Sequence, residues 1–294
     1  MKSGHISKAE VQAYERLSPR EKFRRARILE QFNGTPSLPL AAVFGDTETI
    51  QTLLASGESP NSSGDDGITA LMNAARFSHV ENVRLLLDAG TDVHRKDNQR
   101  GATPLIWAAE NGAAEIVRQL LEAGADPLTQ TSVGATFLHA AVSGRNLEII
   151  KTVLDKNLDV NAGTTDGYTA LHIAAWSRNF GILALLVDRG ADVNAKASGG
   201  LTALLAVTTD DQSFRPADPA CATLLLARGA DANVQDAEGK TPLMGAAFYG
   251  HRSTVKLLIA HGANVDLKDA RGFDAESQAI RARRWKIARF LRNA

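Results

Sequence analysis

The stretch GKTPLMGAAFYGH, residues 239–251, decides how the rest of the chain is interpreted. Its first three letters, at 239–241, also end the phosphate-binding loop of many nucleotide-binding proteins. That loop needs a second glycine five residues earlier, because its backbone must curl to point successive N–H groups at phosphate oxygens. Val234 stands there instead, and Asp236 and Glu238 would repel phosphate. A nucleotide site is therefore a poor interpretation of these letters.

The same stretch recurs along the chain, and this recurrence explains it better. Residues 67–76 read GITALMNAAR, 101–110 read GATPLIWAAE and 167–176 read GYTALHIAAW. The leading glycines share one slot of the pattern and are Gly67, Gly101, Gly134, Gly167, Gly200, Gly239 and Gly272. They are 33 or 34 residues apart, except for one step of 39. A period near 33 with a T-[PA]-L-x-x-A-A core is typical of stacked helical repeats, and it resembles the ankyrin family.

The resemblance implies an all-α repeat solenoid, an ankyrin-type stack of about eight helix-turn-helix units joined by hairpin-like turns. A threonine before each first helix is placed to cap its free N–H groups. The second helix ends at a left-handed glycine, for which Asn157 substitutes once. The array is expected over 34–294, with units 34–66, 67–100, 101–133, 134–166, 167–199, 200–238, 239–271 and a terminal cap, 272–294.

Residues 1–33 lie outside the repeat and carry two capping-box patterns. They predict an N-terminal extension of two helices, about 8–17 and 19–32. A further departure is an insertion of six residues within 210–218. We interpret it as a tolerated surface insertion rather than a contact element, although both are open.

Composition bears on where the protein works. There is no run of ~18 apolar residues that would predict a transmembrane helix. The N-terminus lacks the apolar stretch of a secretory signal. The single cysteine, Cys221, fits a reducing compartment and a packed position on an apolar helix face. We therefore expect a cytoplasmic protein, while secretion by a non-classical route stays open.

No residue pattern points to catalysis or metal binding. The seven histidines include no pair at i+3 or i+4, and no cysteine cluster accompanies them, which argues against zinc. His139 and His172 occupy the histidine position of the family's T-P-L-H motif, where the resemblance implies a bond to neighbouring backbone. The paired acids at 65–66 and 210–211 lie in turns, where aspartate is common. The sequence predicts a protein that is not an enzyme and holds no cofactor and no metal.

Charge is unevenly distributed although the formal net charge is zero. Residues 36–269 carry 18 Lys/Arg and 27 Asp/Glu, whereas 270–294 carry 7 and 2. Basic clusters at both ends could hold nucleic acid or anionic membrane, and this is kept as an alternative function. We interpret Trp285, Ile287 and Leu291, which interrupt the last cluster, as packing residues. A solvated cap face is therefore favoured over a nucleic-acid site.

Ankyrin arrays are mostly binding platforms that use turn tips and the exposed side of each first helix. Two slots of the repeat meet this description: the residue before the threonine and the two residues after the alanine pair. Aromatic and arginine side chains in such slots suit protein interfaces, where these types dominate the binding energy. The candidate partner-binding residues are Arg76, Phe77, Glu110, Asn111, Tyr168, Trp176, Lys240, Phe248 and Tyr249.

These residues predict a protein–protein interaction module, a scaffold that binds a partner protein through the concave face and turn tips of its array. The sequence does not identify that partner. One alternative is an adaptor that a bacterium secretes as an effector into a host cell.

Overall fold

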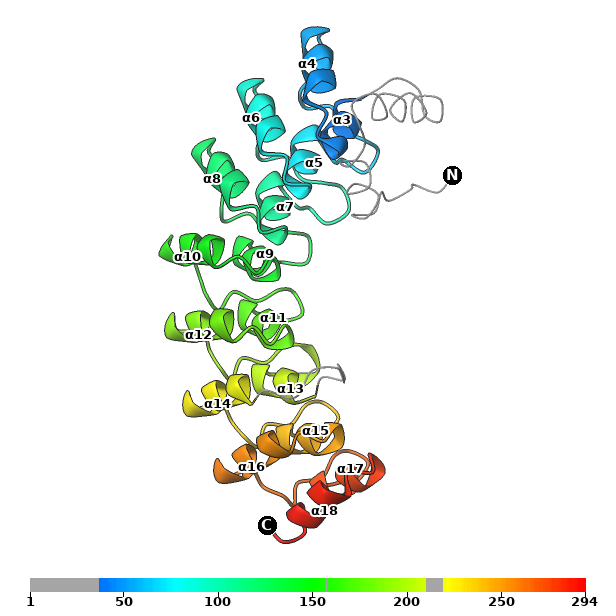
Figure 1. Cartoon of the computed structure of the whole chain (residues 1–294), viewed down its shortest axis with the longest axis vertical. Helices are drawn as coiled ribbons and strands as arrows, with labels where there is room; N and C mark the ends of the chain where they lie inside the picture. The colour runs from blue at the N-terminus through cyan, green and yellow to red at the C-terminus, as the bar shows by residue number, and fades with distance from the viewer. Residues whose placement is uncertain (1–36, 157, 210–218) are drawn as a thin grey trace. The chain divides into compact units, whose positions relative to one another are not determined.

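The computed structural model describes residues 37–156, 158–209 and 219–294, and within these ranges every regular element is helical (Figure 1). The predicted N-terminal helices, Asn157 and the 210–218 insertion lie outside the described residues. The chain divides into two compact units, one ending at Ser132 and the other spanning Val133–Ala294. Each unit is described by itself.

The first unit contains three helix pairs in its described part. They are α3 (Leu38–Phe44) with α4 (Thr47–Ala55), α5 (Ala70–Arg76) with α6 (Val80–Asp88), and α7 (Pro104–Glu110) with α8 (Ala114–Glu122). First helices pack on first helices, with α5 in contact with α3 and α7. Second helices pack on second helices in the same way, with α6 in contact with α4 and α8.

The second unit contains five pairs in its described part. They are α9 (Phe137–Ser143) with α10 (Leu147–Asp155), α11 (Ala170–Trp176) with α12 (Phe180–Asp188), α13 (Ala203–Thr208) with α14 (Ala220–Ala227), α15 (Pro242–Tyr249) with α16 (Arg252–Ala260), and α17 (Ala275–Arg281) with α18 (Trp285–Leu291). One 3-10 turn, η1 (Ser198–Gly200), precedes α13. The first helices α9, α11, α13, α15 and α17 pack in succession. The prediction of an all-α repeat stack is confirmed.

The repeated Leu and Ala slots form the core of each unit. Leu71, Leu105, Leu171 and Leu243 are each at most 1% exposed, and the alanine pairs that follow them are fully buried. Alanine at these positions lets neighbouring first helices approach closely, while each buried leucine contributes roughly 1.5–3 kcal/mol of apolar burial. The sequence period is thus the period of the core.

Three of the six repeat threonines cap their helices through the side-chain oxygen. The Oγ1 atoms of Thr69, Thr202 and Thr241 each accept a hydrogen bond from the backbone N–H three residues on, at 3.2–3.3 Å. Asp274 does the same for Ser277 at 2.8 Å. The Thr103 hydroxyl has no hydrogen-bond partner among the described residues, so its expected capping role was wrong.

A backbone hydrogen bond joins each turn to the turn of the preceding repeat. In the second unit, Ser198 N–H donates to the Asp166 carbonyl at 2.7 Å, and Ala270 N–H donates to Glu238 at 2.8 Å. This close approach explains the leading glycine. A Cβ on Gly167, which has φ +76°, would lie 3.1 Å from the Lys196 carbonyl oxygen. Neither the left-handed backbone nor the available space suits a side chain there.

His139 and His172 bond neighbouring backbone, as the resemblance implied. His139 Nδ1 accepts a hydrogen bond from the Thr136 N–H at 3.2 Å, and Nε2 donates to the Tyr168 carbonyl of the next repeat at 2.8 Å. His172 repeats the pattern, with Nε2 3.1 Å from the Leu201 carbonyl oxygen. Because Nδ1 faces an N–H donor, both imidazoles fit these sites in the neutral form.

The leading glycines and the helix-ending glycines give a matched test of the turn-to-turn contact. Gly167 and Gly190 both have positive φ, but a Cβ on Gly190 would meet nothing within 4 Å. Gly190→Ala should cost about 1–2 kcal/mol, the strain of a left-handed alanine. Gly167→Ala should cost roughly 1–3 kcal/mol more, because its Cβ also presses on the next turn. Equal midpoints in urea unfolding would show that the close approach carries no energetic weight.

The histidine bonds predict a pH-dependent stability. Burial, the largest influence, lowers the pKa of both His139 and His172, although their bonds to main-chain oxygens act in the opposite direction. The unfolded state therefore binds more protons, so the stability from the neutral imidazoles is complete above about pH 6.5 and is lost as pH falls through the folded pKa. We expect the urea midpoint to fall less between about pH 7 and pH 5 in the His139→Gln/His172→Gln variant than in the natural chain. Parallel pH profiles for the two proteins would contradict this prediction.

Candidate functional site

One candidate residue of the first unit, Arg76, contacts an indole ring that was not among the candidates. The guanidinium carbon of Arg76 lies 4.9 Å from the centroid of the Trp107 ring, and that of Arg100 lies at the same distance. Arg100 also forms an ion pair with Glu110. Each contact of a guanidinium group with an aromatic ring is worth roughly 0.5–1 kcal/mol at an exposed site.

Trp107 is fixed in place by a buried acid. Its Nε1 donates to Asp97 Oδ2 at 3.2 Å, and Asp97 is 4% exposed. Asn111 Nδ2 donates to the Trp107 carbonyl oxygen at 2.9 Å, while the Phe77 ring centroid lies 5.3 Å from the guanidinium carbon of Arg76. The four candidate residues of this unit are therefore linked into one cluster with Trp107 and Arg100.

Trp176 and Tyr168 form a second group, in the second unit. Their ring centroids are 5.0 Å apart and the rings are tilted by 38°. Tyr168 also makes an edge contact with the buried His172 at 6.0 Å, so the fold holds it in place. Trp176 is the last residue of α11 and keeps 46% of its surface exposed. A large aromatic side chain resting on a fixed ring can serve as an anchor for a partner.

Lys240, Phe248 and Tyr249 form a third group, around a hollow of about 340 Å³ in the second unit. The rings of Phe248 and Tyr249 are 5.1 Å apart and nearly perpendicular, and Phe248 is 38% exposed. Lys240 Nζ lies 2.7 Å from Glu238 Oε2. The volume of the hollow is near the lower end of the range of about 300–1,000 Å³ that is usual for ligand pockets.

Buried apolar residues and exposed cationic residues both line the hollow. Leu205 of α13 and Met244 of α15 are at most 2% exposed. Arg271 and Arg281, which sequence analysis did not include among the candidates, line the exposed side. The remaining lining residues are Leu201, Thr209, Asp236, Gly245 and Gln278.

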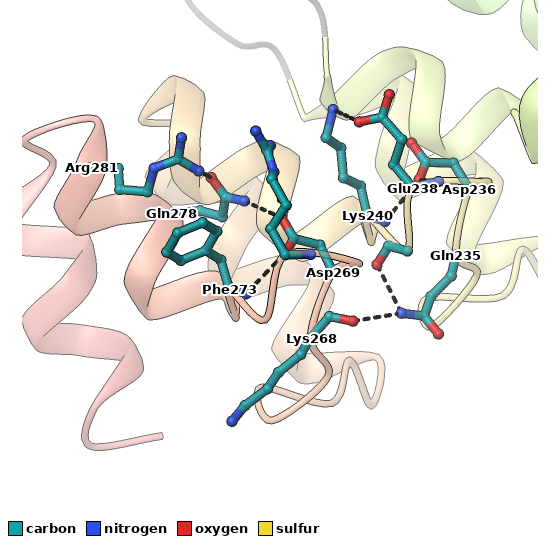
Figure 2. Close-up of polar contacts among 11 residues, drawn as sticks. Gln235, Asp236, Glu238, Lys240, Lys268, Asp269, Phe273, Gln278 and Arg281 are labelled. Atoms are coloured by element: carbon teal, nitrogen blue, oxygen red, sulfur yellow. Dashed lines mark hydrogen bonds and ion pairs between the residues drawn. The ribbon is translucent and has the colours of Figure 1, made fainter.

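A buried carboxylate organises the polar side of the hollow (Figure 2). Asp269 accepts hydrogen bonds from the N–H groups of Arg271 and Phe273, both at 2.9 Å, and from Gln278 Nε2 at 2.8 Å. Burial, the largest influence, raises the pKa of Asp269, but the two backbone N–H groups, the Arg271 charge and the Gln278 amide together hold it below its ordinary value. Asp269 is therefore ionised at neutral pH.

The C-terminal helix corrects one expectation. Ile287 and Leu291 are each 4% exposed, as predicted for packing residues, but Trp285 is 62% exposed. Helix α18 buries Ile287, Ala288 and Leu291, and Trp285 lies roughly 110° around the helix from the centre of that stripe. The interpretation of Trp285 as a packing residue was wrong for this reason.

Two other features of the described residues bear on function. No helix among them is long and apolar enough to cross a lipid bilayer. Nor do three or more His, Cys, Asp or Glu side chains gather there in a group that could hold a metal ion. Cys221 is a buried thiol, in agreement with its predicted position on an apolar helix face.

The chain matches the family described as ankyrin repeats (3 copies) over residues 38–131, 127–197 and 214–294. These segments cover most of the chain, so the protein belongs to the ankyrin repeat family. Ankyrin repeats are generally protein–protein interaction modules, and the family is typically non-enzymatic.

Two curated relatives are similar over part of their length. The chain is 35% identical over 71 residues to the ankyrin repeat-containing protein P1E11.10 of Schizosaccharomyces pombe, a match that covers 24% of this chain and 34% of the relative. It is 38% identical over 104 residues to Protein PhlB of Serratia liquefaciens, covering 35% of this chain and 46% of the relative. The chain thus spans less than half the length of each of these two relatives.

Proposed function

We propose that the protein binds a partner protein through exposed side chains of its first helices and turns, and that it acts as a non-enzymatic scaffold. The observation that carries this proposal is Trp176, which is 46% exposed and rests on Tyr168 at 5.0 Å between ring centroids. Its slot holds Arg76, Glu110 and Ser143 in other repeats, so the fold itself does not require a large aromatic side chain there.

The two units offer different chemistry to a partner. In the first unit, Arg76, Arg100 and Glu110 present charge around the half-buried ring of Trp107. In the second, Trp176 and Phe248 present apolar surface, at 46% and 38% exposure. We place the protein in the cytoplasm, where its one cysteine fits a reducing environment. An adaptor secreted by a bacterium into a host cell would use the same surfaces.

We expect Trp176→Ala and Phe248→Ala each to weaken partner binding by about 2 kcal/mol, roughly thirtyfold, with an unchanged melting temperature. The full chain would serve as bait for affinity capture and mass spectrometry. Captured proteins would then be titrated against each variant by calorimetry.

Two variants control this experiment. Trp285→Ala removes a tryptophan that is 62% exposed on α18, and it should leave partner binding intact. Leu171→Ala removes a core side chain that is 1% exposed, and it should lose about 2–5 kcal/mol of folding stability. If Trp176→Ala unfolds like Leu171→Ala, Trp176 is a core residue. If it folds and binds normally, the partner uses another face.

A second candidate function is charge-driven binding of nucleic acid or anionic lipid at the C-terminal helix. The exposed Trp285 favours it, since Arg283, Arg284 and Lys286 around it are exposed as well. We rank it second because aromatic stacking platforms use several rings, and this cluster exposes one.

If the basic cluster is a solvated cap face, affinity for random duplex DNA should be weak and should vanish near physiological salt. Salt titrations of labelled duplex measured by anisotropy would check this. Sub-micromolar binding that survives physiological salt, and that disappears in an Arg283→Gln/Arg284→Gln/Arg289→Gln variant, would place nucleic-acid binding first.

A further inference from the structure

The hollow in the second unit is bordered by a glycine, in a slot where two other repeats carry a large apolar side chain. Gly245 of α15 occupies the slot that holds Trp107 in α7 and Ile173 in α11. A Cβ on Gly245 would lie 2.6 Å from Thr209 Cγ2 and 3.0 Å from the Thr208 carbonyl oxygen. The end of α13 therefore approaches α15 too closely for a side chain at residue 245. Because the slot holds glycine, no side chain projects from it into the hollow.

Three cationic side chains line the hollow, and they differ in how well their charge is neutralised. Lys240 pairs with Glu238 at 2.7 Å, whereas Arg271 lies 4.0 Å from Asp269 Oδ2. Arg281 pairs with no carboxylate among the residues that the structure describes; its contacts are with a neutral amide and an aromatic ring. Arg281 is thus the cation of the hollow that is left without a counter-ion there.

Two acids beside the hollow, Asp236 and Asp269, are already occupied by backbone donors. Asp236 Oδ1 accepts the N–H groups of Glu238 and Lys240 at 2.9 and 2.8 Å. Asp269 accepts two backbone N–H groups in its own turn, and its second oxygen accepts Gln278. These bonds orient both carboxylates toward their own turns and limit their capacity to pair with Arg281.

Arg281 is held in one orientation. Its guanidinium carbon lies 4.4 Å from the Phe273 ring centroid, and Nη1 donates to Gln278 Oε1 at 3.2 Å (Figure 2). That bond uses one of the five N–H donors of the guanidinium group, which leaves enough of them for a two-bond contact with a carboxylate. Because the stack on Phe273 already restricts the side chain, little further rotamer freedom is lost on binding.

The turns beside the hollow are also fixed to one another. Gln235 Nε2 donates to the Gly239 carbonyl oxygen at 2.8 Å and to the Lys268 carbonyl oxygen at 3.2 Å, and so joins the turns before α15 and α17 (Figure 2). The hollow is therefore formed before any partner arrives.

We infer that this hollow binds a peptide segment of a partner protein in which an aspartate or glutamate lies next to an apolar residue. The apolar side chain enters the hollow against Leu205, Met244 and Phe248, and the carboxylate pairs with Arg281. This inference rests on the proposed function, of which it specifies one partner segment.

The charge of the surrounding chain favours a single carboxylate over a polyanion. Residues 36–269 carry 18 Lys/Arg and 27 Asp/Glu, so a nucleic acid laid across these repeats would meet an excess of negative charge. A peptide presents one carboxylate locally and offers further apolar side chains to the exposed Phe248. A volume of about 340 Å³ suits side chains of this size rather than an extended polymer.

The test starts from a displayed library of random decapeptides selected on the immobilised full chain. Enriched peptides should carry Asp or Glu within two positions of Leu, Ile or Phe. One such peptide and its counterpart with Glu replaced by Gln would be titrated by fluorescence anisotropy against the natural chain and three variants.

Arg281→Gln should weaken binding of the acidic peptide about tenfold or more, as expected for the loss of a charge-assisted hydrogen bond. It should weaken binding of the Gln peptide less than about twofold. Arg281→Lys should give an intermediate loss for the acidic peptide, because it keeps the charge without the planar two-bond contact. Arg252→Gln, the same change at an exposed position of α16, should alter neither affinity.

The outcomes separate this inference from the proposed function. Peptides that bind without any acid preference and depend on Trp176 would overturn the inference and leave the proposed function standing. Enrichment of no peptide would overturn the inference alone, because the proposed function is tested by capture of whole proteins. Should Arg281→Gln fail to fold, the unaltered protein still decides: the acidic peptide must bind at least about tenfold tighter than its Gln counterpart, by an amount that shrinks with added salt.

Discussion

The backbone hydrogen bond from each turn to the preceding turn is the contact on which the rest of each unit depends. It recurs at 2.7–2.9 Å throughout the described repeats, for example from Thr165 to Val133 and from Ala237 to Gly199. Because donor and acceptor are both main-chain groups, the side chains at the turn tips are left to vary. The bond constrains the leading glycine instead: a Cβ on Gly239 would lie 3.1 Å from the next turn's backbone. The glycine of the Gly-Lys-Thr letters at 239–241 follows from this constraint, and Thr241 is the N-cap of α15.

The sequence was enough to predict the helices and the core, because the contacts that set them are local and repeat. Leu71 and Leu171 lie in equivalent positions and are both buried, so the slot alone determined their environment. Exposure at the ends of helices was harder to predict. Trp285 and Ile287 are two residues apart on α18, yet they are 62% and 4% exposed. Their difference depends on which face of the last helix packs, and the repeat pattern is weakest there.

The candidate residues were predicted from their positions in the repeat, and a position in the repeat does not determine which side chains are in contact. Trp107 was missed because it lies just before the alanine pair, outside the two slots from which the candidates came, although its ring contacts both Arg76 and Arg100. Arg281 was interpreted as part of a solvated basic face, whereas the structure stacks it on Phe273, eight positions earlier in the chain. A glycine within a helix costs about 1 kcal/mol relative to alanine, so Gly245 was itself a signal of a close contact.

One acidic position connects the turns to these functional side chains. Asp97, Asp236 and Asp269 each lie three or four residues before a leading glycine, and each accepts backbone N–H groups of its turn. In two of the three repeats, the second carboxylate oxygen also accepts a hydrogen bond from the side chain in the slot just before that of the alanine pair. Trp107 donates to Asp97, and Gln278 donates to Asp269. In the third repeat that slot holds Gly245, which offers no side chain to bond, and Asp236 lines the hollow instead. The role of this turn acid thus depends on the one residue that occupies that slot of the first helix. With tryptophan there, the acid fixes an aromatic ring, and with glutamine it fixes the amide that orients Arg281. With glycine there, the acid borders an open space.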